Sequence, residues 1–195
     1  MTYTLLYLRA RRVPLALAVA MGAAATIWTL WQLLSDQRDA GLTAVLLTVV
    51  LMVAVLSTTL AAPDESLERT ASFHWPWRRV AHLLAVLAVV LLVLLATLHT
   101  GARFGPAGVV IRDAAGLLGL TALTATVLGA TRCWFVALGW TVVAAVFPQS
   151  GTWGTPATWQ AAPPDSRPAA LLAAGFAVTG LLTYAVAGPA RRLAD

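Results

Sequence analysis

The chain contains apolar runs that are too long for the helices of a soluble protein. An α-helix rises about 1.5 Å per residue, so about 20 residues cross the hydrocarbon core of a bilayer. Six runs reach or approach that length, and they cover residues 13–34, 42–62, 80–98, 109–131, 133–147 and 169–188. The sequence therefore predicts one all-α integral membrane domain, residues 1–195, with six transmembrane helices.

The composition excludes a soluble globular domain. Hydrophobic residues make up 59% of the chain and charged residues only 11%, whereas soluble domains carry about 25% charged residues. The formal charge of +5 does not indicate nucleic-acid binding, because the arginines lie at the ends of apolar runs and form no contiguous patch. The first run is longer than the core of a signal peptide, about 7–15 residues, so we expect it to remain as a span.

The arginines predict the orientation in the membrane. If successive loops alternate between the two sides, one side receives nine arginines and the other receives four. Positive residues concentrate in cytoplasmic loops, so both termini and residues 63–79 should be cytoplasmic and the loop 149–168 should lie outside. The nine are Arg9, Arg11, Arg12, Arg69, Arg78, Arg79, Arg132, Arg191 and Arg192, and the four are Arg38, Arg103, Arg112 and Arg167.

The segment 63–79, PDESLERTASFHWPWRR, is a charged stretch between the second and third spans. Asp64 can cap a helix whose first turn carries Glu65 and Glu68, where negative charge suits the helix dipole. Trp75 should end that helix, because it precedes a proline, and Pro76 suits the first turn of the next one. The pattern predicts a short amphipathic surface helix, a bend and a new helix, although an ordinary inter-helix loop is an alternative.

Two features lie in the second half of the chain. The fourth span is rich in small residues, which let helix backbones approach closely in a membrane: Gly116, Gly119, Thr121, Ala122, Thr124, Ala125, Thr126 and Gly129. Arg112 and Asp113 should face the outer interface at the start of this span, with a substrate-gating pair as the alternative. The loop 149–168 is long and rich in proline and glycine, so it could re-enter the membrane or lie on its surface.

Residue patterns for catalysis or metal binding are not found. His74, His82 and His99 are not grouped with other ligands, and neither an HExxH nor a P-loop motif occurs. Ser150 has no histidine partner in any span, and the single Cys133 has no second thiol. We therefore expect neither an enzyme nor a metal or cofactor site, and the predicted spans contain few ionisable residues.

Taken together, these features resemble the permease subunit of a type-two ABC exporter, including permeases common in actinobacteria. The resemblance covers most of the chain from about residue 42. It includes the acids, Leu67 and the proline–arginine pattern of 63–79, the stretch IRDAAGLLGLTALTATVLGATRCW and the ending GLLTYAVAGPARR. The chain departs from the family in the aromatic WPWRR, the first span and the short fifth span.

The resemblance implies a multi-pass subunit of a bacterial plasma membrane, working with a separate ABC ATPase and a second permease copy or paralogue. The ATPase would use the ATP. Leu67, Ala71 and Phe73 would be apolar anchors on it, and Glu65, Glu68 and Arg69 would be rim charges. The complete set of residues implied in ATPase coupling is Asp64, Glu65, Leu67, Glu68, Arg69, Ala71, Phe73, Pro76, Arg78 and Arg79.

Apolar spans with scattered threonine and tryptophan suit a hydrophobic or amphipathic cargo better than an ion. A drug, an antibiotic, a peptide or a lipid-like molecule is expected, which connects the chain to multidrug or antibiotic resistance. A second hypothesis is a non-transporting membrane scaffold that recruits a cytoplasmic partner through residues 63–79. A third, a membrane enzyme, is disfavoured by the scarcity of ionisable residues in the spans.

Overall fold

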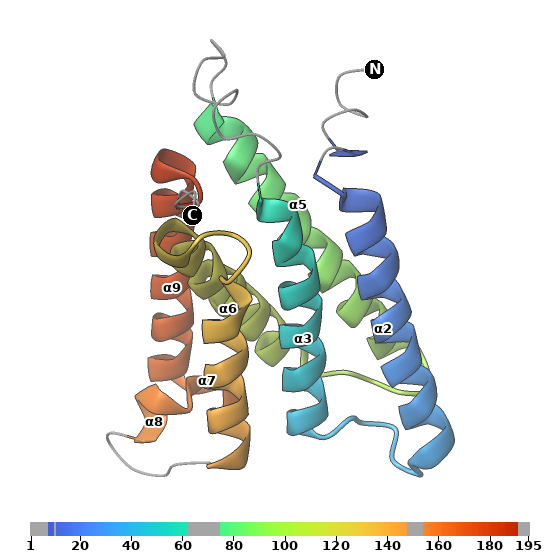
Figure 1. The fold of residues 1–195 in the computed structure, drawn as a ribbon. Helices are drawn as coiled ribbons and strands as arrows, with labels where there is room; N and C mark the ends of the chain where they lie inside the picture. Colours follow the sequence, from blue (N-terminus) through green and yellow to red (C-terminus); the bar gives the residue numbers. More distant parts are fainter. Residues whose placement is uncertain (1–7, 10, 62–74, 148–153, 191–195) are drawn as a thin grey trace.

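The protein is a helical bundle (Figure 1). A computed structural model describes residues 8–9, 11–61, 75–147 and 154–190, and in these ranges the regular structure is entirely helical. The elements are α2 (Val13–Leu34), α3 (Leu42–Ser57), η1 (Thr58–Leu60), α5 (Trp75–Ala96), η2 (Thr97–His99), α6 (Ala107–Leu128), α7 (Trp134–Val146), α8 (Gly154–Ala157), η3 (Trp159–Ala161) and α9 (Arg167–Ala187).

Five of the helices in the described ranges are long and apolar enough to cross a membrane: α2, α3 with η1, α5 with η2, α6 and α9. This agrees with the predicted all-α membrane protein, and α2 has the predicted bounds. The expected fifth span, residues 133–147, corresponds to α7, but α7 has only 13 residues. At 1.5 Å per residue it extends only about 20 Å, against a hydrocarbon core of about 30 Å.

The third long helix begins close to its predicted start. The apolar span was expected from residue 80 and the helix itself from Pro76, and α5 begins at Trp75. Pro76 is compatible with the first turn, because the first N–H groups of a helix have no intrahelical partner. Trp75 to Arg79 therefore belong to α5 itself. The surface helix predicted before them falls on residues 62–74, which lie outside the described ranges.

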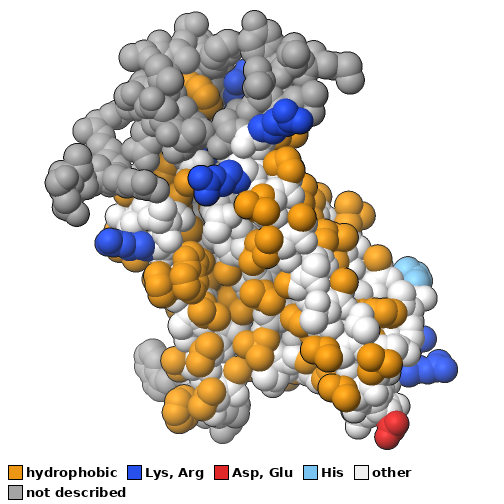
Figure 2. Space-filling view, turned by 45° about the vertical axis from the view of Figure 1, so that its right-hand side comes forward, with side chains coloured by type: hydrophobic (Ala, Val, Ile, Leu, Met, Phe, Trp, Pro, Cys, Tyr) orange, Lys and Arg blue, Asp and Glu red, His pale blue; other side chains and the backbone are white. Residues whose placement is uncertain are grey.

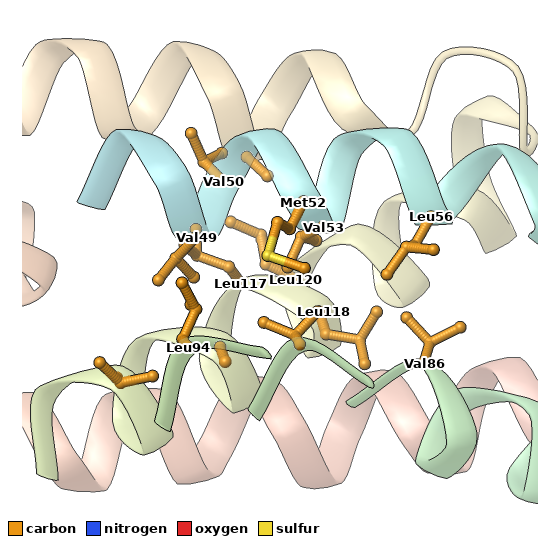
Figure 3. Close-up of a cluster of buried hydrophobic side chains, with 14 of the residues drawn as sticks. Val49, Val50, Met52, Val53, Leu56, Val86, Leu94, Leu117, Leu118 and Leu120 are labelled. Atoms are coloured by element: carbon orange, nitrogen blue, oxygen red, sulfur yellow. The ribbon is translucent and has the colours of Figure 1, made fainter. Parts of the chain in front are cut away.

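The central element is α6. In its most apolar stretch 72% of the residues are buried, against 17% in α2. The core lies where α6 meets α3 and α5, and Figure 3 shows Val49, Val53 and Leu56 of α3 together with Leu117 of α6. These side chains are almost completely inaccessible. Their packing holds the polar residues of α6 in fixed positions.

The most extensive helix–helix contact joins α6 and α9. It depends on glycine, because a Cβ on Gly180 would collide with the Gly119 backbone, and one on Gly119 would collide with the backbone of Phe176 and Ala177. Gly116 is equally crowded, by Trp159 and Ala173. The predicted close packing of this span is therefore confirmed at Gly116 and Gly119.

The two ends of the bundle differ in charge. At the upper end in Figure 1, where α2 and α5 begin and α9 ends, the described residues include six arginines and no acidic side chain. These six are Arg9, Arg11, Arg12, Arg78, Arg79 and Arg132. The four acids of the described ranges, Asp36, Asp39, Asp113 and Asp165, all lie toward the opposite end. On the face in Figure 2, apolar side chains cover the middle and charged ones lie near the two ends.

Candidate functional site

A buried ionisable pair lies inside α6. Arg112 and Asp113 are 8% and 0% exposed, and Arg112 is the sixth residue of the helix, about 8 Å along its axis from the first. The expectation that both residues face the outer interface is therefore wrong. They point into the bundle because the polypeptide between α7 and α9 folds back and supplies them with polar partners.

The guanidinium of Arg112 is held by four hydrogen bonds. Its Nε donates to Asp113 Oδ1 at 2.8 Å, which also forms an ion pair. Its Nη1 donates to the carbonyl of Pro163 at 3.0 Å. Its Nη2 donates to the carbonyls of Gln160 and Ala162 at 3.0 and 3.1 Å. One side chain of α6 thus connects three carbonyl groups of a single short segment.

Those three carbonyls explain why an arginine is required. Irregular backbone is tolerated at membrane depth only where protein or enclosed water satisfies its polar groups. The backbone after η3 is not continuously helical, so its carbonyls need an external donor. Arginine carries five N–H donors in a fixed planar arrangement, whereas lysine has three on one atom. Arg112 therefore fixes residues 160–163 against α6.

The same segment places a tryptophan between α6 and α9. Trp159 is fully buried, and its Cη2 lies 2.5 Å from the position of a Cβ on Gly116. Its ring centroid is 6.1 Å from that of Phe176 on α9. The adjacent Gln160 is also 0% exposed. Of the two predictions for the loop 149–168, the burial of this part favours a re-entrant segment over a surface one. We call Arg112, Asp113, Trp159 and Gln160 the Arg112 cluster.

A second polar region lies at the arginine-rich end. The Tyr184 hydroxyl of α9 donates to the Leu60 carbonyl at 2.9 Å. Arg79 Nη1 of α5 donates to the Ala185 carbonyl at 3.3 Å. The guanidinium lies against Gly188, where φ is 71° and a Cβ would be 2.6 Å from Arg79 Nη2. We call Leu60, Arg79, Tyr184 and Gly188 the α9 anchor.

Two further hydrogen bonds reinforce this end. Thr59 Oγ1 and His82 Nε2 are 2.8 Å apart, which joins η1 to α5. Arg11 Nη1 donates to the Thr59 carbonyl at 3.4 Å, which joins the residues before α2 to the same turn. The chain on both sides of residues 62–74 is therefore fixed to the rest of the bundle, through η1 on one side and α5 on the other.

Most residues predicted to couple to an ATPase fall on the undescribed segment between these flanks: Asp64, Glu65, Leu67, Glu68, Arg69, Ala71 and Phe73. Pro76, Arg78 and Arg79 form part of the start of α5. Arg78 is exposed, and its guanidinium carbon lies 5.7 Å from the Trp75 ring centroid. Arg79 instead reaches α9, as described above.

Sequence reasoning named Arg112 and Asp113 as an alternative gating pair and Arg79 as a coupling residue, but it did not find the partners of either group. Arg112 and Asp113 carried the available signal, because an ionisable pair within an apolar run is costly and is kept for a purpose. Gln160 and Tyr184 gave no comparable signal. Glutamine in a polar loop and tyrosine near the end of an apolar run are both ordinary, and only their tertiary contacts distinguish them.

Metal-ligating side chains do not gather in the described ranges, where no group of three or more His, Cys, Asp or Glu residues could hold an ion. Cys133, just before α7, is buried, and its thiol lies 3.2 Å from the Ala130 carbonyl. This agrees with the interpretation of Cys133 as a small buried residue at a helix end.

Comparison with known proteins gave no relative on which a function could be based. No protein-family model, curated protein or solved structure matches the chain.

Proposed function

We propose that this chain is the membrane-spanning permease subunit of an ATP-driven exporter, energised by a separate ATPase. The observation that carries the proposal is the burial of residues 158–162 beside α6, where Arg112 binds the carbonyls of Gln160, Ala162 and Pro163. We interpret this part of the chain as a re-entrant segment. Membrane proteins place broken helices and irregular backbone at membrane depth where they bind or move a substrate.

We propose six membrane crossings, with α7 as part of the fifth. The helix is about 10 Å too short to cross the hydrocarbon core alone. The segment that follows α7 packs beside α6 and α9, and we propose that it completes this crossing. Six crossings put both termini on the arginine-rich side, which the positive-inside rule makes cytoplasmic. A bacterial plasma membrane is the proposed location.

The contacts suggest how motion at residues 62–74 would reach the re-entrant segment. The flanks of those residues are fixed to α9 by Tyr184 and Arg79. α9 packs on α6 with backbone contact at Gly119 and Gly180. Trp159 lies between the same two helices near Gly116. A displacement of the α9 anchor by an ATPase would thus change the space that holds Trp159, which is the coupling that the proposal requires.

Other parts of the proposal follow from the resemblance and the apolar interior. Six helices do not easily enclose an export path, so we propose that two permeases, identical or paralogous, form it. The cargo is hydrophobic or amphipathic, of the kind represented by a drug, an antibiotic, a peptide or a lipid-like molecule. The predicted amphipathic helix, with Leu67, Ala71 and Phe73 on one side, is the proposed contact with the ATPase.

A double substitution tests the coupling. Leu67→Ala with Glu68→Ala should abolish energy-dependent efflux of a fluorescent amphipathic dye while the chain still accumulates in the membrane. The matched control is Leu34→Ala with Asp36→Ala, an exposed pair at the opposite end of the bundle, which should leave efflux unchanged. Normal efflux by the first variant would contradict the assignment of residues 63–79 as the coupling segment. A parent chain that confers no energy-dependent efflux would favour the scaffold hypothesis instead.

A further inference from the structure

The Arg112 cluster contains buried polar atoms that the described residues leave without hydrogen bonds. These atoms are Asp113 Oδ2, Trp159 Nε1 and both amide atoms of Gln160, Oε1 and Nε2. Asp113, Trp159 and Gln160 are each 0% exposed, so bulk water cannot reach them. A buried polar group without a partner is rare in native proteins, because burial removes its hydrogen bonds to water.

The three residues that carry these atoms lie close together in the bundle. Asp113 and Gln160 are both tied to the Arg112 guanidinium, Asp113 through its carboxylate and Gln160 through its carbonyl. Trp159 is adjacent to Gln160 and lies against Gly116, one helical turn beyond Asp113. The region therefore lies where α6 and η3 pack against each other.

The chemistry of these atoms defines what would satisfy them. Asp113 Oδ2 and Gln160 Oε1 accept hydrogen bonds, whereas Gln160 Nε2 and Trp159 Nε1 donate them. Arg112 and Asp113 already compensate each other's charge across 2.8 Å. An additional ion would be an uncompensated buried charge, which costs several kcal/mol even after relaxation. A neutral group that both donates and accepts has no such cost.

We propose that the Arg112 cluster is a binding site for a neutral hydrogen-bonding group, of the class of water, a hydroxyl or a carboxamide. In the protein without cargo the group is water, bound to Gln160 and Asp113 next to the Trp159 indole. Buried waters typically make about three hydrogen bonds to groups that would otherwise be unsatisfied, as these atoms allow. The site does not depend on the proposed transport function, since it would exist in a scaffold as well.

Radiolytic hydroxyl-radical labelling with mass spectrometry tests this in the full-length chain purified in detergent. Buried side chains are labelled only where bound water lies beside them. Phe104, 1% exposed, is the buried control, and Trp77, 74% exposed, is the accessible one. We expect Trp159 to be labelled several-fold faster than Phe104. Labelling of Trp159 no faster than Phe104 would overturn the proposal.

A variant and an added probe sharpen the result. Gln160→Leu keeps a similar volume but removes both amide atoms, so labelling of Trp159 should fall to the level of Phe104, and unchanged labelling would overturn the role of Gln160. Excess acetamide, a carboxamide probe, then distinguishes the source of the bound group. Reduced labelling of Trp159 would mean that an organic carboxamide enters the site, and constant labelling would mean that the site holds water alone.

Discussion

The two ends of the bundle use the same interaction in different ways. In the α9 anchor, Tyr184 and Arg79 each donate to carbonyls at helix ends, where regular structure leaves them without partners. In the Arg112 cluster, one guanidinium donates to three carbonyls of an irregular segment, and the amide of Gln160 receives no partner among the described residues. The first arrangement joins helices to one another. The second encloses polar atoms, which is what a binding region needs.

The comparison predicts that substitution of Arg112 destabilises the protein most. Arg112→Met leaves the Asp113 carboxylate buried without its counter-charge, and removes the donor from three carbonyls. The free energy of unfolding should fall by about 3–5 kcal/mol, measured by thermal or SDS unfolding followed by circular dichroism. Adding Asp113→Asn to the same variant should restore part of the loss, because it removes the uncompensated charge. A fall no larger than that of an exposed arginine such as Arg78→Met would contradict the role of Arg112.

The contact between α6 and α9 should give the second-largest loss of stability when it is disrupted. Gly180→Ala places a methyl group on the Gly119 backbone and should separate α6 from α9, at a cost of about 1–3 kcal/mol in the free energy of unfolding. Gly175→Ala is the matched control on the same helix, because nothing lies within 4 Å of its Cβ position. It should be neutral or slightly stabilising, since alanine favours a helix over glycine. Equal effects of the two substitutions would mean that the crossing is not tightly packed.

The α9 anchor should give the smallest loss of stability. Tyr184→Phe removes the hydroxyl that bonds the Leu60 carbonyl, and should cost about 1–2 kcal/mol. Backbone hydrogen exchange in η1 should increase at the same time, because η1 loses its contact to α9. Thr141→Val is the control, a buried hydroxyl that bonds only within its own helix, to the Ala137 carbonyl. Unchanged hydrogen exchange of η1 in Tyr184→Phe would contradict the claim that this hydrogen bond stabilises the contact between η1 and α9.

The long spans could be predicted from the sequence because they depend on local composition alone. The run 13–34 gave the bounds of α2 without error, since arginine precedes it and polar residues follow it. The start of α5 was predicted to within one residue, because a proline suits the first turn of a helix. Small residues in the fourth span correctly indicated a close helix contact, at Gly119.

The candidate site could not be predicted in the same way, because its partners are distant in the sequence. Arg112 lies about 50 positions before the carbonyls that it contacts. Nothing in the order of residues shows that Gln160 and Trp159 fold back beside α6. Without that information, the least costly place for Arg112 and Asp113 is the membrane interface, which is where the prediction put them.

The most direct test of the proposed function is purification of the full chain from its native membrane in mild detergent, with mass spectrometry of the proteins that co-purify. A variant in which residues 64–73 are replaced by a glycine–serine linker of equal length serves as the comparison. The proposal predicts an ABC ATPase in nearly equal amount with the parent chain and its loss from the variant. Parent chain that purifies without any ATPase would contradict the exporter assignment and favour a scaffold that binds another cytoplasmic partner.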